Sequence, residues 1–311
     1  MIAALGRWPR ALVGSIGLAL LALLPGSGAL AQSPATPAAP LVLGAPGSGG
    51  VPNLAHIVLV VMENKGTAAI IGNPAAPYLN ALASRYAYSA AYSAVAHPSL
   101  PNYLALIGGS TYGIDTDCSR CFVSAPNLAD TLALAGKSGM AYLESVPGAC
   151  YTGSTDVYAQ KHNPFIYFTD VRQNWGRCHS LVPYNQLSQA LAANQLPDFS
   201  WITPNICHDM HDCSVATGDQ WLAQNLPPLL ESPAFTQQDS LLAIVWDEAD
   251  GGAGNQVPLI LAGRDVKRGY VSRVPATHYS LLRTIEDAWG LPPLTANDQQ
   301  AVPLADFFVQ P

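Results

Sequence analysis

Positively charged residues are scarce in this chain of 311 residues. Lysine and arginine together number 14, against 21 aspartate and glutamate residues, and the formal net charge is −7 at pH 7. The basic residues form no patch or stripe along the sequence. Binding to a nucleic-acid backbone depends on such a patch, so nucleic acid is not an expected partner. An anionic membrane surface is not expected to attract the protein by charge either.

Long apolar runs are also missing beyond the first residues. Residues 11–24 are apolar but too short to span a bilayer comfortably, and two arginines precede them. Small residues at 29–31 suit cleavage by a signal peptidase. We interpret residues 1–31 as a signal peptide rather than an uncleaved anchor, and we expect a secreted or periplasmic protein without stable membrane insertion.

Cysteine is limited to six residues, all of them after residue 31. An even number of cysteines in an exported chain indicates disulfides. The segment 207–213 has the pattern Cys-His-x-x-His-x-Cys, which could also suggest zinc. We favour a disulfide there because exported proteins meet an oxidising compartment. The expected pairs are local: Cys118 with Cys121, Cys150 with Cys178, and Cys207 with Cys213.

Composition divides the remaining chain into two parts. Residues 32–52 are rich in proline, alanine, glycine and serine and are expected to form a flexible linker. Residues 53–311 are long enough for one catalytic domain with a large buried core.

Strand and helix patterns alternate along this domain. Continuous apolar runs predict strands buried on both faces at Ile57–Met62, Leu241–Trp246 and Val257–Ala262. Shorter strands are predicted at Tyr88–Val95, Met140–Leu143, Phe165–Phe168 and Phe199–Thr203. Helices are predicted at Pro77–Tyr86, Pro101–Ile107, Leu128–Ala135, Tyr184–Ala193, Gly218–Leu230 and His278–Trp289. The alternation predicts an α/β fold with a mainly parallel central sheet and helices on both faces.

Two of the buried strands are followed by acidic residues. Glu63 and Asn64 follow the first, and Asp247 and Glu248 follow the second. Ligands of open α/β sheets bind outside the carboxyl ends of the strands. Carboxylates brought together there repel one another, and a hard divalent cation bound by their oxygens relieves the repulsion. The alternative is that both pairs are ordinary solvated residues at strand ends.

Ser99 lies just before a predicted helix. Pro101 suits the first turn of a helix because its missing N–H would have no partner there. A helix N-terminus offers free N–H groups and a partial positive charge to anions, phosphate above all. The alternative is a plain N-cap serine, and one serine can serve as both cap and nucleophile.

Five ordered motifs carry a resemblance to a known family. They are residues 63–64, 97–106 (HPSLPNYLAL), 158–162 (YAQKH), 209–212 (DMHD) and 246–248 (WDE). Together they resemble the phosphoesterase family of bacterial acid phosphatases and phospholipases C, within the alkaline phosphatase superfamily. The resemblance runs from about residue 56 to residue 293, and it is strongest to secreted acid phosphatases that act on phosphoinositides.

The resemblance implies a metal site in which Ser99 is both ligand and nucleophile. One divalent cation, of unspecified identity, is expected there. Glu248 replaces a metal-binding histidine of the two-metal relatives, and the spacing near residue 209 also departs from theirs, so one cation is expected rather than two. The implied ligands are Glu63, Asn64, Ser99, Asp247 and Glu248.

Further residues are expected to act in catalysis or to bind the phosphate group of the substrate. His97, His211 and His278 are expected to act in catalysis, with a protonated His211 or His278 assisting the leaving alcohol. Asn102 matches a residue that hydrogen-bonds a phosphate oxygen. The other expected substrate-binding residues are Lys161, His162, Asp209 and Asp212.

The function that follows is a secreted, metal-dependent phosphatase that hydrolyses monoesters through a phosphoserine. Its expected substrate is a small-molecule or lipid phosphate ester, such as a phosphoinositide. One alternative is a phosphodiesterase of the phospholipase C kind. A second alternative is a secreted binding protein on an inactive hydrolase scaffold, although every motif position is retained.

Overall fold

The computed structural model describes residues 41–251 and 254–309. The predicted signal peptide lies outside the described residues, as does the first part of the predicted linker. The rest of that segment differs from the expectation. The N–H of Gly44 donates to the carbonyl of Gly290 at 2.7 Å, and the N–H of Ser48 donates to the carbonyl of Asp287 at 3.1 Å. Val51 is buried, so the chain is already packed against the domain before residue 53.

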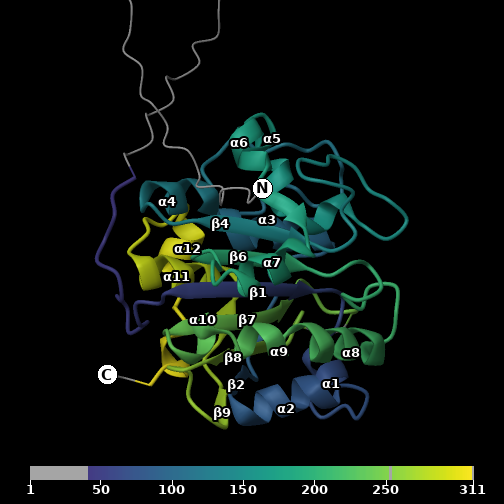
Figure 1. The fold of residues 1–311 in the computed structure, drawn as a ribbon, viewed down its shortest axis with the longest axis vertical. Coiled ribbons are helices and arrows are strands. Elements are labelled where there is room, and N and C mark those ends of the chain that lie inside the picture. Colours follow the sequence, from purple (N-terminus) through teal and green to yellow (C-terminus); the bar gives the residue numbers. More distant parts are fainter. Residues whose placement is uncertain (1–40, 252–253, 310–311) are drawn as a thin grey trace, which may run out of the picture.

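A central sheet of eight strands organises the domain (Figure 1). All its strands are parallel to β1 except β8, which pairs antiparallel with β7 and with β2. A separate small sheet pairs β3 (Tyr92–Ser93) with β10 (Ala276–Thr277). In spatial order the large sheet contains β5 (Leu181–Pro183), β4 (Gly139–Leu143), β6 (Phe199–Thr203), β1 (His56–Met62), β7 (Ser240–Trp246), β8 (Leu259–Gly263), β2 (Ala87–Ser89) and β9 (Tyr270–Ser272).

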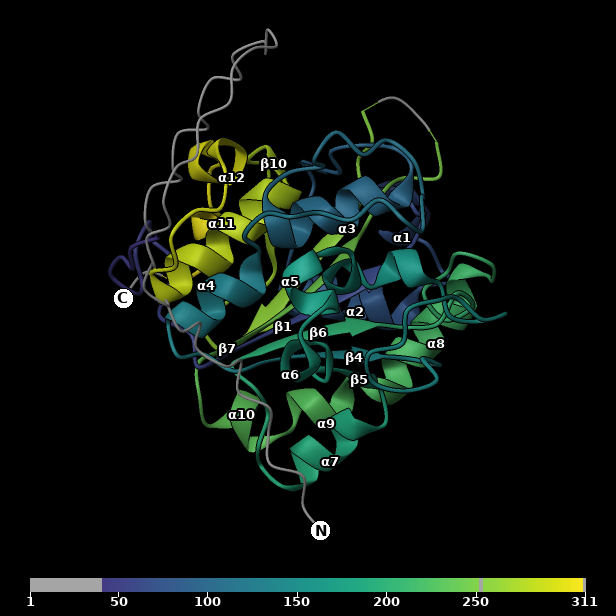
Figure 2. The same ribbon diagram turned by 90° about the horizontal axis from the view of Figure 1, so that it is seen from above.

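Helices cover both faces of this sheet, as predicted (Figure 2). One face carries α3 (Ser99–Gly108), α4 (Leu128–Leu134), α11 (His278–Trp289) and α12 (Ala296–Gln300). The other carries α7 (Gln186–Ala192), α8 (Val215–Asn225), α9 (Pro227–Leu230) and α10 (Pro233–Thr236), and α2 (Pro77–Arg85) packs against α8. The remaining short helices are α1 (Thr67–Ile70), α5 (Thr169–Arg172), α6 (Trp175–Cys178), η1 (Gln160–His162), η2 (Pro164–Tyr167) and η3 (Ala305–Phe307).

The apolar runs form the strands because both faces of each are buried. All seven residues of β7 are buried, and six of the seven residues of β1 are. The predicted α/β class is therefore confirmed, together with the mainly parallel order. Helix α11 begins after a capping box at Thr277 and ends at Trp289, and the φ of 64° at the following residue, Gly290, suits glycine.

Three predicted elements are wrong in detail. The expected strand at Tyr88–Val95 is two strands in different sheets, because the chain turns where the N–H of Ala91 donates to Ser89 Oγ. Phe165–Phe168 is not a strand but lies largely in η2, which Pro164 starts, and a short apolar run does not distinguish the two. The expected helix at Gly218–Leu230 is α8 and α9, separated because Pro227 has no N–H to continue α8.

No helix among the described residues is long and apolar enough to cross a membrane.

Candidate active site

The register of β1 and β7 brings the two acidic strand ends together. These strands are neighbours, and Met62 is paired with Trp246. The N–H of Asp247 donates to the carbonyl of Met62 at 3.0 Å, and the N–H of Asn64 donates to Asp247 Oδ1 at 3.0 Å. The carboxyl ends of two parallel strands therefore form one edge that carries both clusters.

Ser99 lies at the same edge as the first residue of α3. The residue before it, Pro98, supplies no side-chain cap. The Ser99 hydroxyl is buried and lies 3.1 Å from Glu63 Oε2, 3.3 Å from Glu248 Oε1 and 3.3 Å from Lys161 Nζ. The hydroxyl oxygen is thus held between two carboxylates and an ammonium group.

Asn102 fixes the turn that leads into Ser99. Its Oδ1 accepts the N–H groups of Val95 and Ala96, both at 3.0 Å. Its Nδ2 donates to the carbonyls of Ala96 and Pro98 at 2.9 and 3.1 Å. The side-chain amide is fully used by the backbone, so the expected contact with a phosphate oxygen is not available in this arrangement, and Asn102 acts here by positioning Ser99.

His162 is a buried cation between two carboxylates. Its Nε2 lies 3.0 Å from Glu63 Oε1 and its Nδ1 lies 3.0 Å from Asp209 Oδ2, and its ring stacks on Tyr103. Burial lowers the pKa of His162, but Glu63 and Asp209 outweigh it and raise the pKa to about 10. For Glu63, burial raises the pKa, but the charges of His162 and Lys161 lower it to about 2. The imidazole is therefore an imidazolium at neutral pH.

The other two carboxylates at this edge, Asp247 and Glu248, have raised pKa values. Burial, and then the charge of Glu63, raise the pKa of Asp247 well above its usual value. Burial also raises the pKa of Glu248. Within the described chain, the buried atoms Asn64 Oδ1 and Asp247 Oδ2 have no hydrogen-bond partner. Oxygen donors from three carboxylates, an amide and the Ser99 hydroxyl are the kind that a hard divalent cation prefers, so the residues present fit the expected metal in their chemistry.

His278 does not fit the role of proton donor that we expected. It is completely buried, its Nδ1 lies 3.0 Å from the Tyr92 hydroxyl and its Nε2 lies 2.7 Å from the Asp247 carbonyl. Burial lowers its pKa to about 4. A neutral imidazole with both nitrogens engaged cannot protonate a leaving alcohol, so we correct that assignment: His278 holds the backbone that carries Asp247.

His211 and His97 are the more exposed histidines of the site. His211 Nδ1 lies 2.6 Å from Asp212 Oδ1, and the His211 ring lies 5.9 Å from that of His162. Asp212 is exposed and acts on the ring of His211. His97 is half exposed, and its Nδ1 pairs with Glu248 Oε2. His97 therefore contacts a carboxylate that also lies beside Ser99, and His211 lies beside the buried His162.

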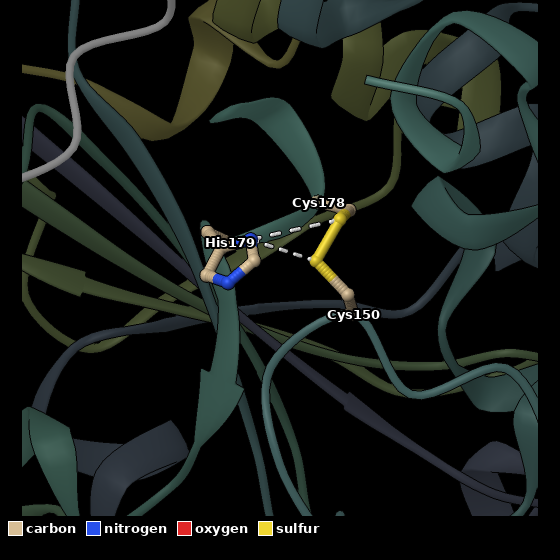
Figure 3. A group of neighbouring side chains, drawn as sticks. All are labelled: Cys150, Cys178 and His179. Carbon is tan, nitrogen blue, oxygen red and sulfur yellow. Dashed lines mark hydrogen bonds between the residues drawn. A yellow bond between two sulfur atoms is a disulfide. The ribbon is translucent and has the colours of Figure 1, made fainter. Parts of the chain in front are cut away.

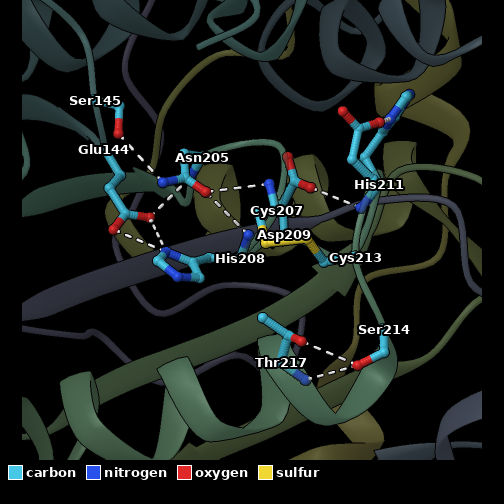
Figure 4. Close-up of a disulfide and its surroundings, with 11 residues drawn as sticks. Glu144, Ser145, Asn205, Cys207, His208, Asp209, His211, Cys213, Ser214 and Thr217 are labelled. Atoms are coloured by element: carbon cyan, nitrogen blue, oxygen red, sulfur yellow. Dashed lines mark hydrogen bonds and ion pairs between the residues drawn. A yellow bond between two sulfur atoms is a disulfide. The ribbon is translucent and has the colours of Figure 1, made fainter. Parts of the chain in front are cut away.

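The segment that carries Asp209 and His211 is anchored from β4 (Figure 4). Glu144 follows β4, accepts the N–H of Asn205 at 2.9 Å and pairs with His208 Nδ1 at 2.9 Å. The disulfide Cys207–Cys213 closes this segment, and the N–H of His211 donates to Asp209 Oδ1 at 2.8 Å. The zinc alternative for these cysteines is therefore excluded.

The two other expected disulfides are also present, Cys118–Cys121 and Cys150–Cys178. His179 Nδ1 lies 3.0 Å from Cys150 Sγ, so Cys150, Cys178 and His179 form a close group (Figure 3). A disulfide supplies no thiolate, so this group is not a metal site.

Sequence reasoning missed two residues that the fold brings to the site. Asn255 Oδ1 accepts the N–H of Ala249, and its Nδ2 donates to the Ala96 carbonyl, both at 2.8 Å. It thereby ties the segment after Glu248 to the segment before Ser99. Asp117 Oδ2 accepts from Lys161 Nζ at 2.8 Å. Neither residue lies in a recognisable motif, and only the proximity of Asp117 to Cys118 marks its segment as constrained.

The fold defines a class of protein, the α/β proteins built on an alkaline-phosphatase-like sheet. Among solved structures, an alkaline phosphatase superfamily protein from Vibrio parahaemolyticus superposes with a TM-score of 0.55 at 14% identity, covering 79% of this chain and 68% of that one. A phosphonate monoester hydrolase from Silicibacter pomeroyi superposes with a TM-score of 0.52 at 14% identity, covering 82% and 76%. At this identity the likeness shows the fold alone.

Sequence comparison identifies the family. Residues 72–292 match the Phosphoesterase family. The chain is 37% identical over 260 residues to the phosphatidylinositol-3-phosphatase of Mycobacterium tuberculosis, covering 83% of this chain and 84% of that protein. It is 34% identical over 226 residues to a probable acid phosphatase of Kluyveromyces lactis, covering 68% of this chain and 53% of that protein. The chain thus spans about half the length of this fungal relative. It belongs to the phosphoesterase family and is a phosphoric ester hydrolase.

Proposed function

We propose that this protein is a secreted, metal-dependent phosphatase that hydrolyses phosphate monoesters through a phosphoserine at Ser99. The observation that carries the proposal is the environment of the Ser99 hydroxyl, which lies between Glu63, Glu248 and Lys161. A nucleophilic hydroxyl beside carboxylates and a cation is the arrangement that phosphoryl transfer requires.

The metal would be held by Glu63, Asn64, Ser99, Asp247 and Glu248. The unpartnered oxygens of Asn64 and Asp247 support this assignment. A divalent cation bound there supplies charge neutralisation and a lower pKa for the Ser99 hydroxyl. One cation is proposed rather than two, because the buried imidazolium of His162 already provides positive charge between Glu63 and Asp209.

Ser99 attacks the phosphorus in line with the leaving oxygen. The Ser99 oxygen–phosphorus bond forms as the bond to the leaving oxygen breaks, and Glu248 Oε1, 3.3 Å away, is placed to accept the hydroxyl proton. Lys161 binds an equatorial phosphate oxygen, and His162 adds positive charge behind the nucleophile. His211 donates a proton to the leaving alcohol. Water then cleaves the phosphoserine and releases phosphate.

The substrate class and the location are proposed from two further observations. A relative that is 37% identical is named a phosphatidylinositol-3-phosphatase, so we propose phosphoinositides among the monoester substrates. Three disulfides support an oxidising compartment and hence a secreted or periplasmic protein.

Three assays test the proposal. The variant Ser99→Ala should keep its circular dichroism spectrum and lose hydrolysis of p-nitrophenyl phosphate, and unchanged turnover would refute the nucleophile. Dialysis against a chelator should abolish activity, and one divalent metal should restore it. An enzyme that stays active after exhaustive chelation has no essential metal. Comparison with bis-p-nitrophenyl phosphate distinguishes a monoesterase from a diesterase.

A further inference from the structure

A carboxylate at the rim of the site already occupies groups that an anion would use. Asp117 lies in the segment between α3 and α4, and its Oδ1 accepts the N–H of Leu100 at 2.9 Å. Its Oδ2 accepts from Lys161 Nζ at 2.8 Å, and the same Nζ lies 3.3 Å from Ser99 Oγ. Asp117 therefore binds the Lys161 ammonium group, to which the proposed function assigns the binding of phosphate. The same ammonium group lies beside the nucleophile.

The first turn of α3 has one N–H donor fewer than usual. Pro101 has no N–H, and the N-cap residue Pro98 has no side chain that could cap the helix. The N–H of Leu100 is one of the donors that remain in this turn, and Asp117 accepts it. The Asp117 side chain is 32% exposed to solvent, so it can yield these groups to a substrate without disturbing the core.

We propose that Asp117 is a specificity-determining residue that selects the charge of the phosphoryl group. The proposal rests on the phosphatase function given above. A bound phosphoryl group has to share Lys161 and the N-terminus of α3 with this carboxylate. Repulsion between the two anions grows with the charge of the phosphoryl group, so the site favours the monoanion of a monoester over its dianion.

The selection is expected to lower the activity on the dianion, and therefore to change how activity depends on pH between pH 5 and pH 8. The second ionisation of a phosphate monoester has a pKa of about 6, so the substrate gains its extra charge between pH 5 and 8. Other charged groups lie around this space. They are present in the wild type and in a variant without the Asp117 carboxylate, so their effects on activity are the same in both proteins. Around Asp117, Lys161 and Ser99 these charged or titratable groups are Tyr167, Glu63, Asp247, Glu248, Asp209, His97, His162 and His211.

The test compares Asp117→Asn with Asp115→Asn at pH 5 and pH 8. Asp115 is an exposed carboxylate two residues away, so its variant removes the same charge without the contacts. The readouts are kcat/KM for p-nitrophenyl phosphate and the inhibition constant of inorganic phosphate, both with saturating metal. Asp117→Asn should raise kcat/KM at pH 8 relative to pH 5 by about tenfold over the wild-type ratio. Asp117→Glu should restore the wild-type ratio, and Asp115→Asn should leave it unchanged.

An equal change of kcat/KM at both pH values would overturn the inference, because a purely structural contact does not depend on the charge of the substrate. Asp117→Ser replaces Asp117→Asn if circular dichroism shows that the asparagine variant is unfolded. The two proposals fail separately. A wild-type protein that does not hydrolyse p-nitrophenyl phosphate with any divalent metal contradicts the proposed function. An active wild type whose neutral variant keeps the wild-type pH ratio contradicts only the role of Asp117.

Discussion

Replacing His162 by glutamine removes a buried cation from between Glu63 and Asp209, and the free energy of unfolding should fall by an amount that depends on pH. The pKa of His162 is about 10 in the folded protein, against 6.5 for a free histidine. The folded protein therefore binds more protons than the unfolded chain between pH 6.5 and 10, and this contribution is lost as the pH rises through that window. The full contribution, present below pH 6.5, is on the order of 5 kcal/mol, and about 2 kcal/mol remains at pH 8.5.

At low pH the contribution of Glu63 to stability changes in the opposite direction, increasing as the pH rises. Its folded pKa of about 2 lies below its usual value of 4.5. Its contribution is present above pH 4.5 and is lost as the pH falls toward 2. The same pair is responsible for both effects, so the advantage of the wild type over His162→Gln should be largest between pH 4.5 and 6.5.

Urea unfolding of the metal-free proteins, followed by tryptophan fluorescence at pH 6 and pH 8.5, measures this advantage. His56→Gln is the matched control, since His56 lies at the other end of β1 and its Nδ1 lies 2.9 Å from the Pro197 carbonyl. The double variant with Asp209→Asn should recover part of the loss, because it removes an unpaired buried charge. A free-energy difference that is the same at both pH values would refute the buried imidazolium.

Two further predictions concern stability and positioning. Burial and the nearby Asp298 raise the pKa of Glu286 to about 10. The native protein therefore retains a proton that the unfolded chain loses near pH 4.5, and its stability falls as the pH rises. In urea unfolding, Glu286→Gln should stabilise the protein by on the order of 4 kcal/mol at pH 7.5 and by little at pH 4, and equal effects at both pH values would contradict this. Asn255→Ala removes the hydrogen bonds to Ala249 and Ala96, so it should cost about 1–3 kcal/mol of stability. It should also lower kcat for p-nitrophenyl phosphate more than it changes KM. Wild-type kinetics in this variant would show that Asn255 does not position the site.

The sequence predicts the parts of this molecule that depend on local chemistry. The runs at β1 and β7 are continuously apolar, and this alone indicates strands buried on both faces. Their acidic ends are expected to meet at the carboxyl edge of the sheet, and the register of Met62 with Trp246 brings them together. Each of the three disulfides joins two cysteines that follow one another in the sequence, as expected.

Contacts between distant segments are not predictable in this way. Tyr92 and His278 are 186 residues apart, and burial of the imidazole between Tyr92 and Asp247 changes it from a possible acid into a neutral support. Asn102 carries the residue type that binds phosphate, yet the turn at residues 95–98 uses all of its hydrogen-bonding capacity. Asp117 reaches Lys161 only because the segment after α3 folds back over the start of that helix.

Trapping the covalent intermediate tests the central claim most directly. The wild-type enzyme, mixed with p-nitrophenyl phosphate and metal, is quenched in acid during turnover and digested, and its peptides are analysed by mass spectrometry. We predict one added phosphoryl group on Ser99, and none in Ser99→Ala, whose turnover should be lost. A phosphoryl group on a different residue, or undiminished turnover by Ser99→Ala, would contradict the account.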